Sequence, residues 1–225
     1  MTPAEATRPV AIFGGRGDGV LAAFALARAA APHPSPLAGF LNDVEAPGSL
    51  IEGTVVLGPF AHWSSLPSIT HFLAPLHKAK EMGQRAQLIR ALGVSDNRWA
   101  NVIDPAAIVA DGTLIGSGIW AQSGSMVMPG ARVGSHVALR AGCQVSHDCV
   151  VEDFAFVGHG VIVCGCSIVR RGAYLAPGAI VRDRVTVGCY SVVGLGAVIV
   201  ENVPDGAIVL GNPARIVGTV GDRSD

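Results

Sequence analysis

The chain has 225 residues, a formal net charge of -1 and a charged fraction of only 15%. This balance gives no electrostatic reason to expect DNA, RNA or an anionic membrane as a partner. Half of the residues are hydrophobic, but no run reaches the ~18 uninterrupted apolar residues that span a bilayer. We therefore expect a globular protein with no nucleic-acid partner and no membrane insertion.

The five cysteines and the N-terminus bear on the cellular compartment. The N-terminus lacks the apolar segment flanked by basic residues that marks a secretory signal. An odd number of cysteines also argues against a complete disulfide framework. We expect reduced thiols and a cytoplasmic protein. Cys164 and Cys166 form a close pair, but no second pair completes a structural zinc site.

The N-terminal part alternates strand-like and helical patterns. In chain order, the predicted elements are a strand at 9–13, a glycine-rich turn at 14–19, a helix at 20–31, strands at 37–41 and 54–57, and a helix at 78–92. A strand, a glycine turn, a helix and a second strand are the opening of a βαβ unit. The sequence thus predicts a small Rossmann-like α/β domain at 1–97.

The glycine turn has two interpretations. Backbone N–H groups next to a helix N-terminus favour anions, so the turn could hold a phosphate. The dinucleotide-binding fingerprint is not met, because its third glycine falls on Val20. The alternative is a tight turn in a small α/β domain without a ligand.

From Ile103 to Ile199 the chain repeats every six residues without an insertion. The repeated position is Val, Ile or Leu, except at Ala121; Gly recurs three residues later, and a mostly small or β-branched residue four residues later. A hexad period is typical of a parallel β-helix, in which the aliphatic residue points inward and Gly takes the corner where φ is often positive. The sequence therefore predicts a β-helix domain at 98–225.

The repeat is broken at His147 and Asp148, because Asp148 occupies a corner where Gly is usual. Such violations concentrate at functional sites. A neutral imidazole can accept a proton from an attacking amine or hydroxyl, and an adjacent carboxylate can fix its tautomer. The pair is a candidate general base with its partner; the alternative is two solvated corner residues.

Three stretches together resemble a known family: residues 145–154 (VSHDCVVEDF), residues 40–43 (FLND) and the tail at 203–215 (VPDGAIVLGNPAR). They are similar to the sugar acyltransferases related to sialic acid O-acetyltransferase and to the bacterial UDP-4-amino-sugar (bacillosamine-type) N-acetyltransferases. The resemblance implies a left-handed parallel β-helix with three hexads per coil and a homotrimer with active sites between subunits. It also implies acetyl-CoA as the acyl donor, no metal, and a nucleotide sugar held by the N-terminal module.

Carried over by position, the resemblance assigns His147 as the general base, Asp148 as its orienting partner and Gly165 as the N–H donor to the thioester oxygen. Ala176 and Pro177 are implied to meet the pantetheine arm, and Gly165 is implied to contact the cofactor as well. Further implied contacts are Asn212, Pro213 and Arg215 for the adenine end of the cofactor, and Arg16, Gly17, Asp18, Asn42 and Asp43 for the nucleotide sugar. Phe156 stands where many relatives have a second histidine that contacts the cofactor.

The expected reaction is acetyl transfer to the amino group of a nucleotide-linked 4-amino-4,6-dideoxy sugar, in surface-glycan biosynthesis. O-acetylation of a sugar hydroxyl is the nearest alternative, because the same base serves a hydroxyl. A zinc hydratase of the γ-carbonic-anhydrase type would need His136, His147 and His159 to converge, but their spacings do not match a coil of three hexads. A non-catalytic scaffold or nucleotide-sugar sensor is a further alternative.

Four arginines follow the candidate pair in the sequence: Arg170, Arg171, Arg182 and Arg184. They are either contacts for CoA phosphates or solvated corner residues.

Overall fold

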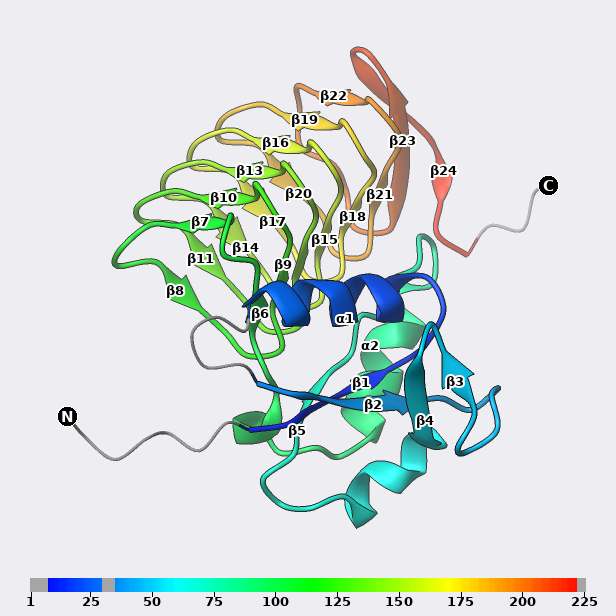
Figure 1. Ribbon diagram of the computed structural model, residues 1–225. Coiled ribbons are helices and arrows are strands. Elements are labelled where there is room, and N and C mark those ends of the chain that lie inside the picture. The colour runs from blue at the N-terminus through cyan, green and yellow to red at the C-terminus, as the bar shows by residue number, and fades with distance from the viewer. Residues whose placement is uncertain (1–7, 30–34, 222–225) are drawn as a thin grey trace.

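The computed structural model describes residues 8–29 and 35–221, and it consists of a small α/β unit packed against the side of a β-helix (Figure 1). The elements of the α/β unit are β1 (Val10–Phe13), α1 (Asp18–Ala29), β2 (Leu37–Leu41), β3 (Leu50–Ile51), β4 (Thr54–Gly58), η1 (Phe60–Ser65), β5 (His71–Leu73), α2 (Met82–Ala91) and η2 (Asp96–Arg98). Among the described residues, no helix combines the length and apolar character that a bilayer crossing requires.

The sheet of this unit has the order β3-β4-β2-β1-β5. β1 pairs in parallel with both β2 and β5, and β2 pairs in parallel with β4, so β1, α1 and β2 form the predicted βαβ unit. α1 begins at Asp18, two residues before the predicted start, and residues 30 and 31 of the predicted helix lie outside the described part. α2 begins later than predicted, because Lys80 has φ 64°, which no α-helix accommodates.

The β-helix is built from two-residue strands stacked in three sheets. Face 1 comprises β6 (Val102–Ile103), β9 (Trp120–Ala121), β12 (Ala138–Leu139), β15 (Phe156–Val157), β18 (Tyr174–Leu175) and β21 (Val192–Val193). Face 2 comprises β7 (Ile108–Val109), β10 (Met126–Val127), β13 (Gln144–Val145), β16 (Ile162–Val163), β19 (Ile180–Val181) and β22 (Val198–Ile199). Face 3 comprises β8 (Leu114–Ile115), β11 (Arg132–Val133), β14 (Val150–Val151), β17 (Ile168–Val169) and β20 (Thr186–Val187).

Each strand pairs in parallel with the strand 18 residues further on, as Val127 does with Val145 and Val145 with Val163. Three hexads therefore make one coil, and the predicted parallel β-helix is confirmed. A hairpin of β23 (Ala207–Gly211) and β24 (Ala214–Thr219) extends face 1 at the C-terminal end.

The hexad residues fill the interior of the β-helix. From Ala121 to Ile199 every one of them is at most 3% exposed, and small residues such as Cys143, Ala155 and Ala179 fill the space beside them. Burial of this aliphatic stripe is the main stabilising contribution to such a fold. Ile103, Val109 and Ile115 are less buried than predicted, because they belong to the first coil and no coil lies beneath them.

The corners between faces follow one backbone rule. From Gly112 to Gly196, the third residue after each hexad residue has φ between 54° and 78°, whether or not it is glycine. We call the corners edge A (face 1 to face 2), edge B (face 2 to face 3) and edge C (face 3 to face 1). On edge A this residue is glycine at all five such corners, Gly124, Gly142, Gly160, Gly178 and Gly196.

The six exceptions to glycine lie on the other two edges: Asp148, Cys166 and Arg184 on edge B, and His136, Phe154 and Tyr190 on edge C. A non-glycine residue in this left-handed region costs about 1–2 kcal/mol. Edge C packs against the α/β unit, where Phe154 and His136 stack with ring centroids 5.0 Å apart and Trp99 meets His136 edge-on at 4.6 Å. Edge B carries the predicted catalytic pair.

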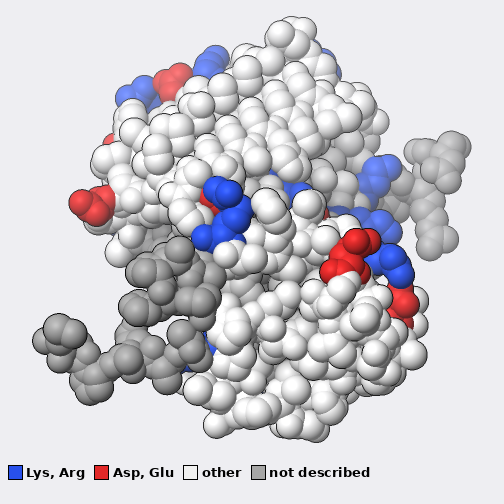
Figure 2. Space-filling model, viewed as in Figure 1, with Lys and Arg blue, Asp and Glu red and all other residues white. Residues whose placement is uncertain are grey.

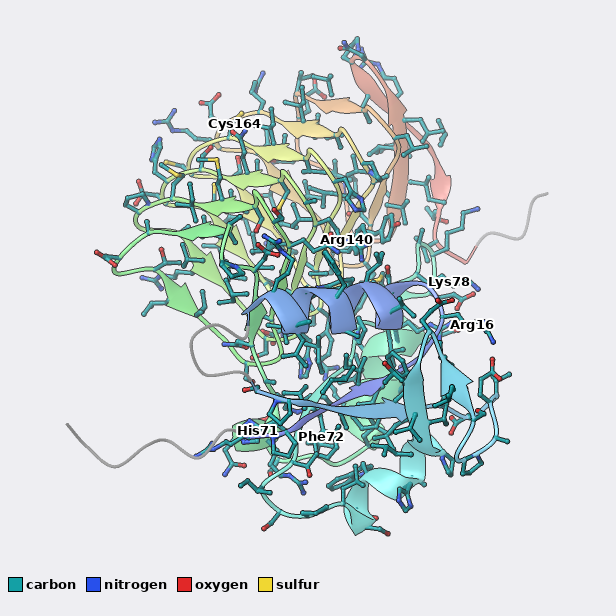
Figure 3. All side chains as sticks on the ribbon, viewed as in Figure 1. Arg16, His71, Phe72, Lys78, Arg140 and Cys164 are labelled. Carbon is teal, nitrogen blue, oxygen red and sulfur yellow. The ribbon has the colours of Figure 1, made fainter. Side chains whose placement is uncertain are left out.

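α1 lies across face 1 and joins the two parts of the molecule (Figure 1). The outward-facing Trp120, Ala138 and Phe156 of face 1 are 0–6% exposed beneath it. An ion pair fixes each end of α1. At its start, Asp18 Oδ1 accepts from Arg140 Nη1 at 2.8 Å, and near its end Arg28 Nε donates to Asp104 Oδ2 at 2.7 Å. Arg140 lies between α1 and the β-helix (Figure 3).

His136 is buried at this joint, and its Nδ1 has no hydrogen-bond partner in the described part of the chain. Burial lowers the pKa of His136 from 6.5 to about 4. Between pH 4 and pH 6.5, His136 is therefore protonated in the unfolded chain but not in the native protein. Because of this difference, the free energy of unfolding falls as the pH drops from about 6.5 to 4.

We predict that His136→Phe flattens this pH dependence. Phe154 adopts the same corner conformation one coil later, with φ 60°, so a second phenylalanine fits the backbone at position 136. Between pH 7 and pH 4 the variant should lose about 3 kcal/mol less stability than the parent protein, as measured by urea unfolding. An unchanged pH profile would contradict the assigned titration.

Candidate active site

His147 and Asp148 lie on edge B, directly after β13. Asp148 takes the corner position with φ 57°, and its N–H donates to the Pro129 carbonyl in the preceding coil at 3.2 Å. The His147 Nδ1 and Asp148 Oδ2 atoms are 2.9 Å apart, and both side chains are 64% exposed. Because an ionised carboxylate can only accept, Nδ1 carries the proton and the lone pair of the ring lies on Nε2. The ring can therefore act as a base toward a group in solvent.

Gly165 lies one coil beyond His147, beneath the imidazole ring. A Cβ at position 165 would stand 2.5 Å from His147 Nε2, so the ring lies across this residue only because it is glycine. Two hydrogen bonds fix the backbone here: Cys166 N–H donates to the His147 carbonyl, and Arg184 N–H donates to the Gly165 carbonyl, both at 3.0 Å. The Gly165 N–H has no acceptor within the described residues, so it is free to donate to a ligand.

The sequence analysis did not include Cys166 in this site. Cys166 has the same corner position as Asp148 one coil later, with φ 59°. Potential ligand atoms of His147, Asp148 and Cys166 all lie within 4.8 Å of one another. The 18-residue spacing between two non-glycine corners is the signal in the sequence that could have identified it.

The glycine turn predicted to hold the nucleotide sugar lies between β1 and α1. Arg16 is largely exposed and pairs with Glu45 at 3.0 Å, Gly17 has φ 72°, and Asp18 is held by Arg140. The backbone N–H groups of residues 15–19 have no acceptors among the described residues. Free N–H groups at a helix N-terminus are a suitable environment for an anion.

Asn42 and Asp43 follow β2 and shape the loops next to this turn. Asn42 Oδ1 accepts from the N–H groups of Val44 and Glu45 at 2.7 and 2.9 Å, and its Nδ2 donates to the Gly14 carbonyl. Asp43 Oδ1 accepts from the Phe60 N–H at 2.7 Å. Both side chains therefore have a structural role in the unliganded chain.

The two halves of the predicted site lie far apart within one chain. The α/β unit packs on face 1, whereas His147 lies on edge B, the edge opposite face 1. Arg16 and Cys164, which is next to Gly165, lie on opposite sides of the molecule (Figure 3). The structure thus brings together His147, Asp148 and Gly165, and separately Arg16, Gly17 and Asp18.

The predicted cofactor contacts are also spread over the molecule. Ala176 and Pro177 lie on edge A, at the other margin of face 2 from His147. Asn212, Pro213 and Arg215 lie in or next to the turn between β23 and β24, at the C-terminal end. Phe156 is 6% exposed under the α/β unit and stacks on Tyr174 at 4.4 Å, which leaves little of its surface for a cofactor.

The remaining candidates are divided among the edges. Arg182 and Arg184 lie on edge B near His147, whereas Arg170 and Arg171 lie on edge C. The three histidines considered for a zinc hydratase occupy one edge each: His136 on edge C, His147 on edge B and His159 on edge A. They do not converge within one chain.

No protein-family model matches the chain. The acetyltransferase domain of PglB from Neisseria gonorrhoeae FA1090, solved with acetyl coenzyme A, superposes with a TM-score of 0.82 at 29% identity, covering 94% of this chain and 100% of that one. A single-residue mutant of perosamine N-acetyltransferase from Caulobacter crescentus, solved with CoA and GDP-perosamine, superposes with a TM-score of 0.82 at 25% identity, covering 93% of this chain and 97% of that one.

Among curated sequences, GDP-perosamine N-acetyltransferase from Escherichia coli O157:H7 is 30% identical over 116 residues, which are 49% of this chain and 52% of that protein. The chain spans 29–52% of the length of the first curated relatives that it matches. The fold is that of the hexapeptide-repeat acyltransferases. Within that class, the structural neighbours include perosamine N-acetyltransferase, and the sequence relatives include amino-sugar N-acetyltransferases as well as serine acetyltransferases and a γ carbonic anhydrase.

We predict that Gly165→Ala displaces the His147 ring. The added methyl group would lie 2.5 Å from Nε2, so the ring must move by on the order of 1 Å to restore van der Waals contact. A crystal structure of the variant measures this shift. Gly218→Ala is the control, since a Cβ at Gly218 meets no atom within 4 Å. A His147 ring that stays in place in Gly165→Ala would show that Gly165 is not needed to seat it.

Proposed function

We propose that the protein is an acetyl-CoA-dependent N-acetyltransferase acting on the amino group of a nucleotide-linked sugar of the 4-amino-4,6-dideoxy type, in surface-glycan biosynthesis. The observation that carries the proposal is the His147–Asp148 pair, whose ring lies over Gly165, a residue with a free backbone N–H. Neighbours with the same fold were solved with acetyl coenzyme A, and with CoA and GDP-perosamine.

The proposed reaction is a direct attack of the amine on the thioester. As the nitrogen bonds to the carbonyl carbon, His147 Nε2 takes a proton from it, and Asp148 stabilises the imidazolium that forms. The carbonyl oxygen becomes an oxyanion that accepts a hydrogen bond from the Gly165 N–H. Collapse of this intermediate breaks the carbon–sulfur bond, and the CoA thiolate leaves and is protonated by His147.

In this proposal the two parts of the chain bind different substrates. A Rossmann-like domain at 1–97 holds the nucleotide sugar on the free N–H groups of residues 15–19, with Arg16 next to the phosphates. A left-handed β-helix at 98–225 holds acetyl-CoA, with its thioester at edge B. Ala176 and Pro177 contact the pantetheine arm, and Asn212, Pro213 and Arg215 flank the adenine end.

One chain alone does not complete this site, because the sugar-binding turn and His147 lie on opposite sides of the β-helix. We therefore propose a homotrimer in which the turn of one subunit faces edge B of the next. The outward residues of face 2 support this assembly, since Ile108, Met126, Ile162, Ile180 and Val198 are apolar and only Gln144 is polar. A partly exposed apolar ladder of this kind is typical of an interface. The free cysteines and the nucleotide-activated substrate support a cytoplasmic location.

We predict that His147→Ala lowers turnover by about 10²–10⁴-fold, the usual contribution of a general base, while leaving the melting temperature unchanged. The measurement compares amino-sugar and hydroxyl-sugar acceptors with acetyl-CoA. Asp111→Ala is the control, because Asp111 occupies the equivalent corner site two coils earlier. Acetylation of hydroxyl acceptors alone would identify the protein as an O-acetyltransferase instead. Full activity of His147→Ala would show that His147 is not the general base.

We predict that two inactive variants restore each other when co-expressed. His147→Ala disables edge B, and Arg16→Glu repels phosphate from the glycine turn. If each site uses His147 from one subunit and Arg16 from the next, random mixing gives about a quarter of intact sites. Activity near a quarter of the parent value supports the shared site, whereas activity as low as that of each variant alone would place the site within one chain.

A further inference from the structure

We propose that His147, Asp148 and Cys166 form a zinc-binding site that inhibits the enzyme by occupying its base. Potential ligand atoms of the three side chains lie within 4.8 Å of one another. Imidazole, carboxylate and thiolate are the ligands that zinc takes in proteins, and a set that contains a thiolate does not suit magnesium or calcium.

The β-helix itself brings the three ligands together. Asp148 and Cys166 occupy the same corner of successive coils and have nearly equal φ, 57° and 59°, so the backbone turns in the same way at both positions. Neighbouring strands of a sheet are about 4.8 Å apart, which sets the distance between the two residues. Because position 165 has no side chain, the imidazole lies over the coil that carries Cys166.

The ligands need only a small movement to bind one ion. Zinc lies about 2.0–2.3 Å from nitrogen, oxygen and sulfur, so its ligands are roughly 3.3–3.7 Å from one another in a tetrahedral site. The side chains of His147 and Asp148 are 64% exposed and can rotate toward Cys166. The nearby Arg184 is turned toward Asp183, with Nη1 at 3.1 Å from Oδ2, which partly neutralises its charge.

Zinc binding and proton transfer exclude one another at His147. A neutral imidazole has one nitrogen with a lone pair and one that carries a proton. If the metal binds Nε2, the base is occupied directly. If the metal binds Nδ1 instead, the single proton of the neutral ring moves to Nε2, which then has no lone pair with which to accept another. The inhibition rests on the proposed function, whereas the metal binding does not.

The test uses cobalt(II) as a spectroscopic substitute for zinc, with the full chain and no substrate. Binding through Cys166 should produce the thiolate-to-cobalt charge-transfer absorption in the near ultraviolet, and zinc should abolish it by displacement. Cys166→Gly should remove the band and weaken zinc binding about 10-fold or more in calorimetry. This variant suits the backbone, since most of the other corners carry glycine at the same φ.

Cys164→Ser is the matched control, because it removes a thiol two residues away and should retain both the band and the zinc affinity. A band that is absent from the parent protein, or that persists in Cys166→Gly, would overturn the proposed site. In acetyl-transfer assays, zinc should inhibit the parent protein at concentrations about 10-fold lower than Cys166→Gly. A protein that shows the band but transfers no acetyl group would refute the proposed function and leave the metal site standing.

Discussion

Hydrogen bonding between successive coils is the constraint on which the candidate site depends. At every corner from His136 to Gly196 the backbone N–H bonds to a carbonyl of the preceding coil, as Asp148 does with Pro129, Cys166 with His147 and Arg184 with Gly165. These bonds hold residues 18 positions apart in columns along the β-helix. His147 lies above Gly165 for this reason, and not because the two are close in sequence. A shift of one residue would place Cys164 or Cys166 beneath the ring.

The corners divide the β-helix into edges with different roles. Edge A uses glycine where φ is positive, and so carries no local strain. On edge C the strain of His136 and Phe154 is offset by aromatic packing against the α/β unit. On edge B, Asp148 and Arg184 are exposed and gain no comparable packing. Strain that persists without a packing contribution is typical of functional positions.

Charged side chains are concentrated where the α/β unit meets the β-helix (Figure 2). On the surface in view, charged side chains gather along the seam between the two parts and at the outer margins, and the β-helix surface between them is uncharged (Figure 2). The ion pairs Asp18–Arg140 and Arg28–Asp104 belong to the joint between α1 and the β-helix. The hydrogen bond from Arg28 lowers the pKa of Asp104 and keeps this carboxylate charged.

The sequence predicted those features that repeat or that lie close together along the chain. The hexad period determines strands, corners and interior, because each coil contacts only its neighbours. The pairing of His147 with Asp148 is local as well. The ion pair between Asp18 and Arg140 was not predictable, since it joins residues 122 positions apart and depends on how the α/β unit docks. The burial of Phe156 has the same origin, because its neighbours in sequence resemble those of exposed strands on the other faces.

The register also limits how this protein can change its length. A loss of six residues between His147 and Gly165 would preserve the hexad pattern, yet it would move every later residue by one face and remove Gly165 from beneath the imidazole. A loss of 18 residues on the C-terminal side of the site would shorten the β-helix by one coil and leave the site intact. We therefore expect this part of the chain to accept length changes of whole coils, and shorter insertions only where they bulge outward from an edge.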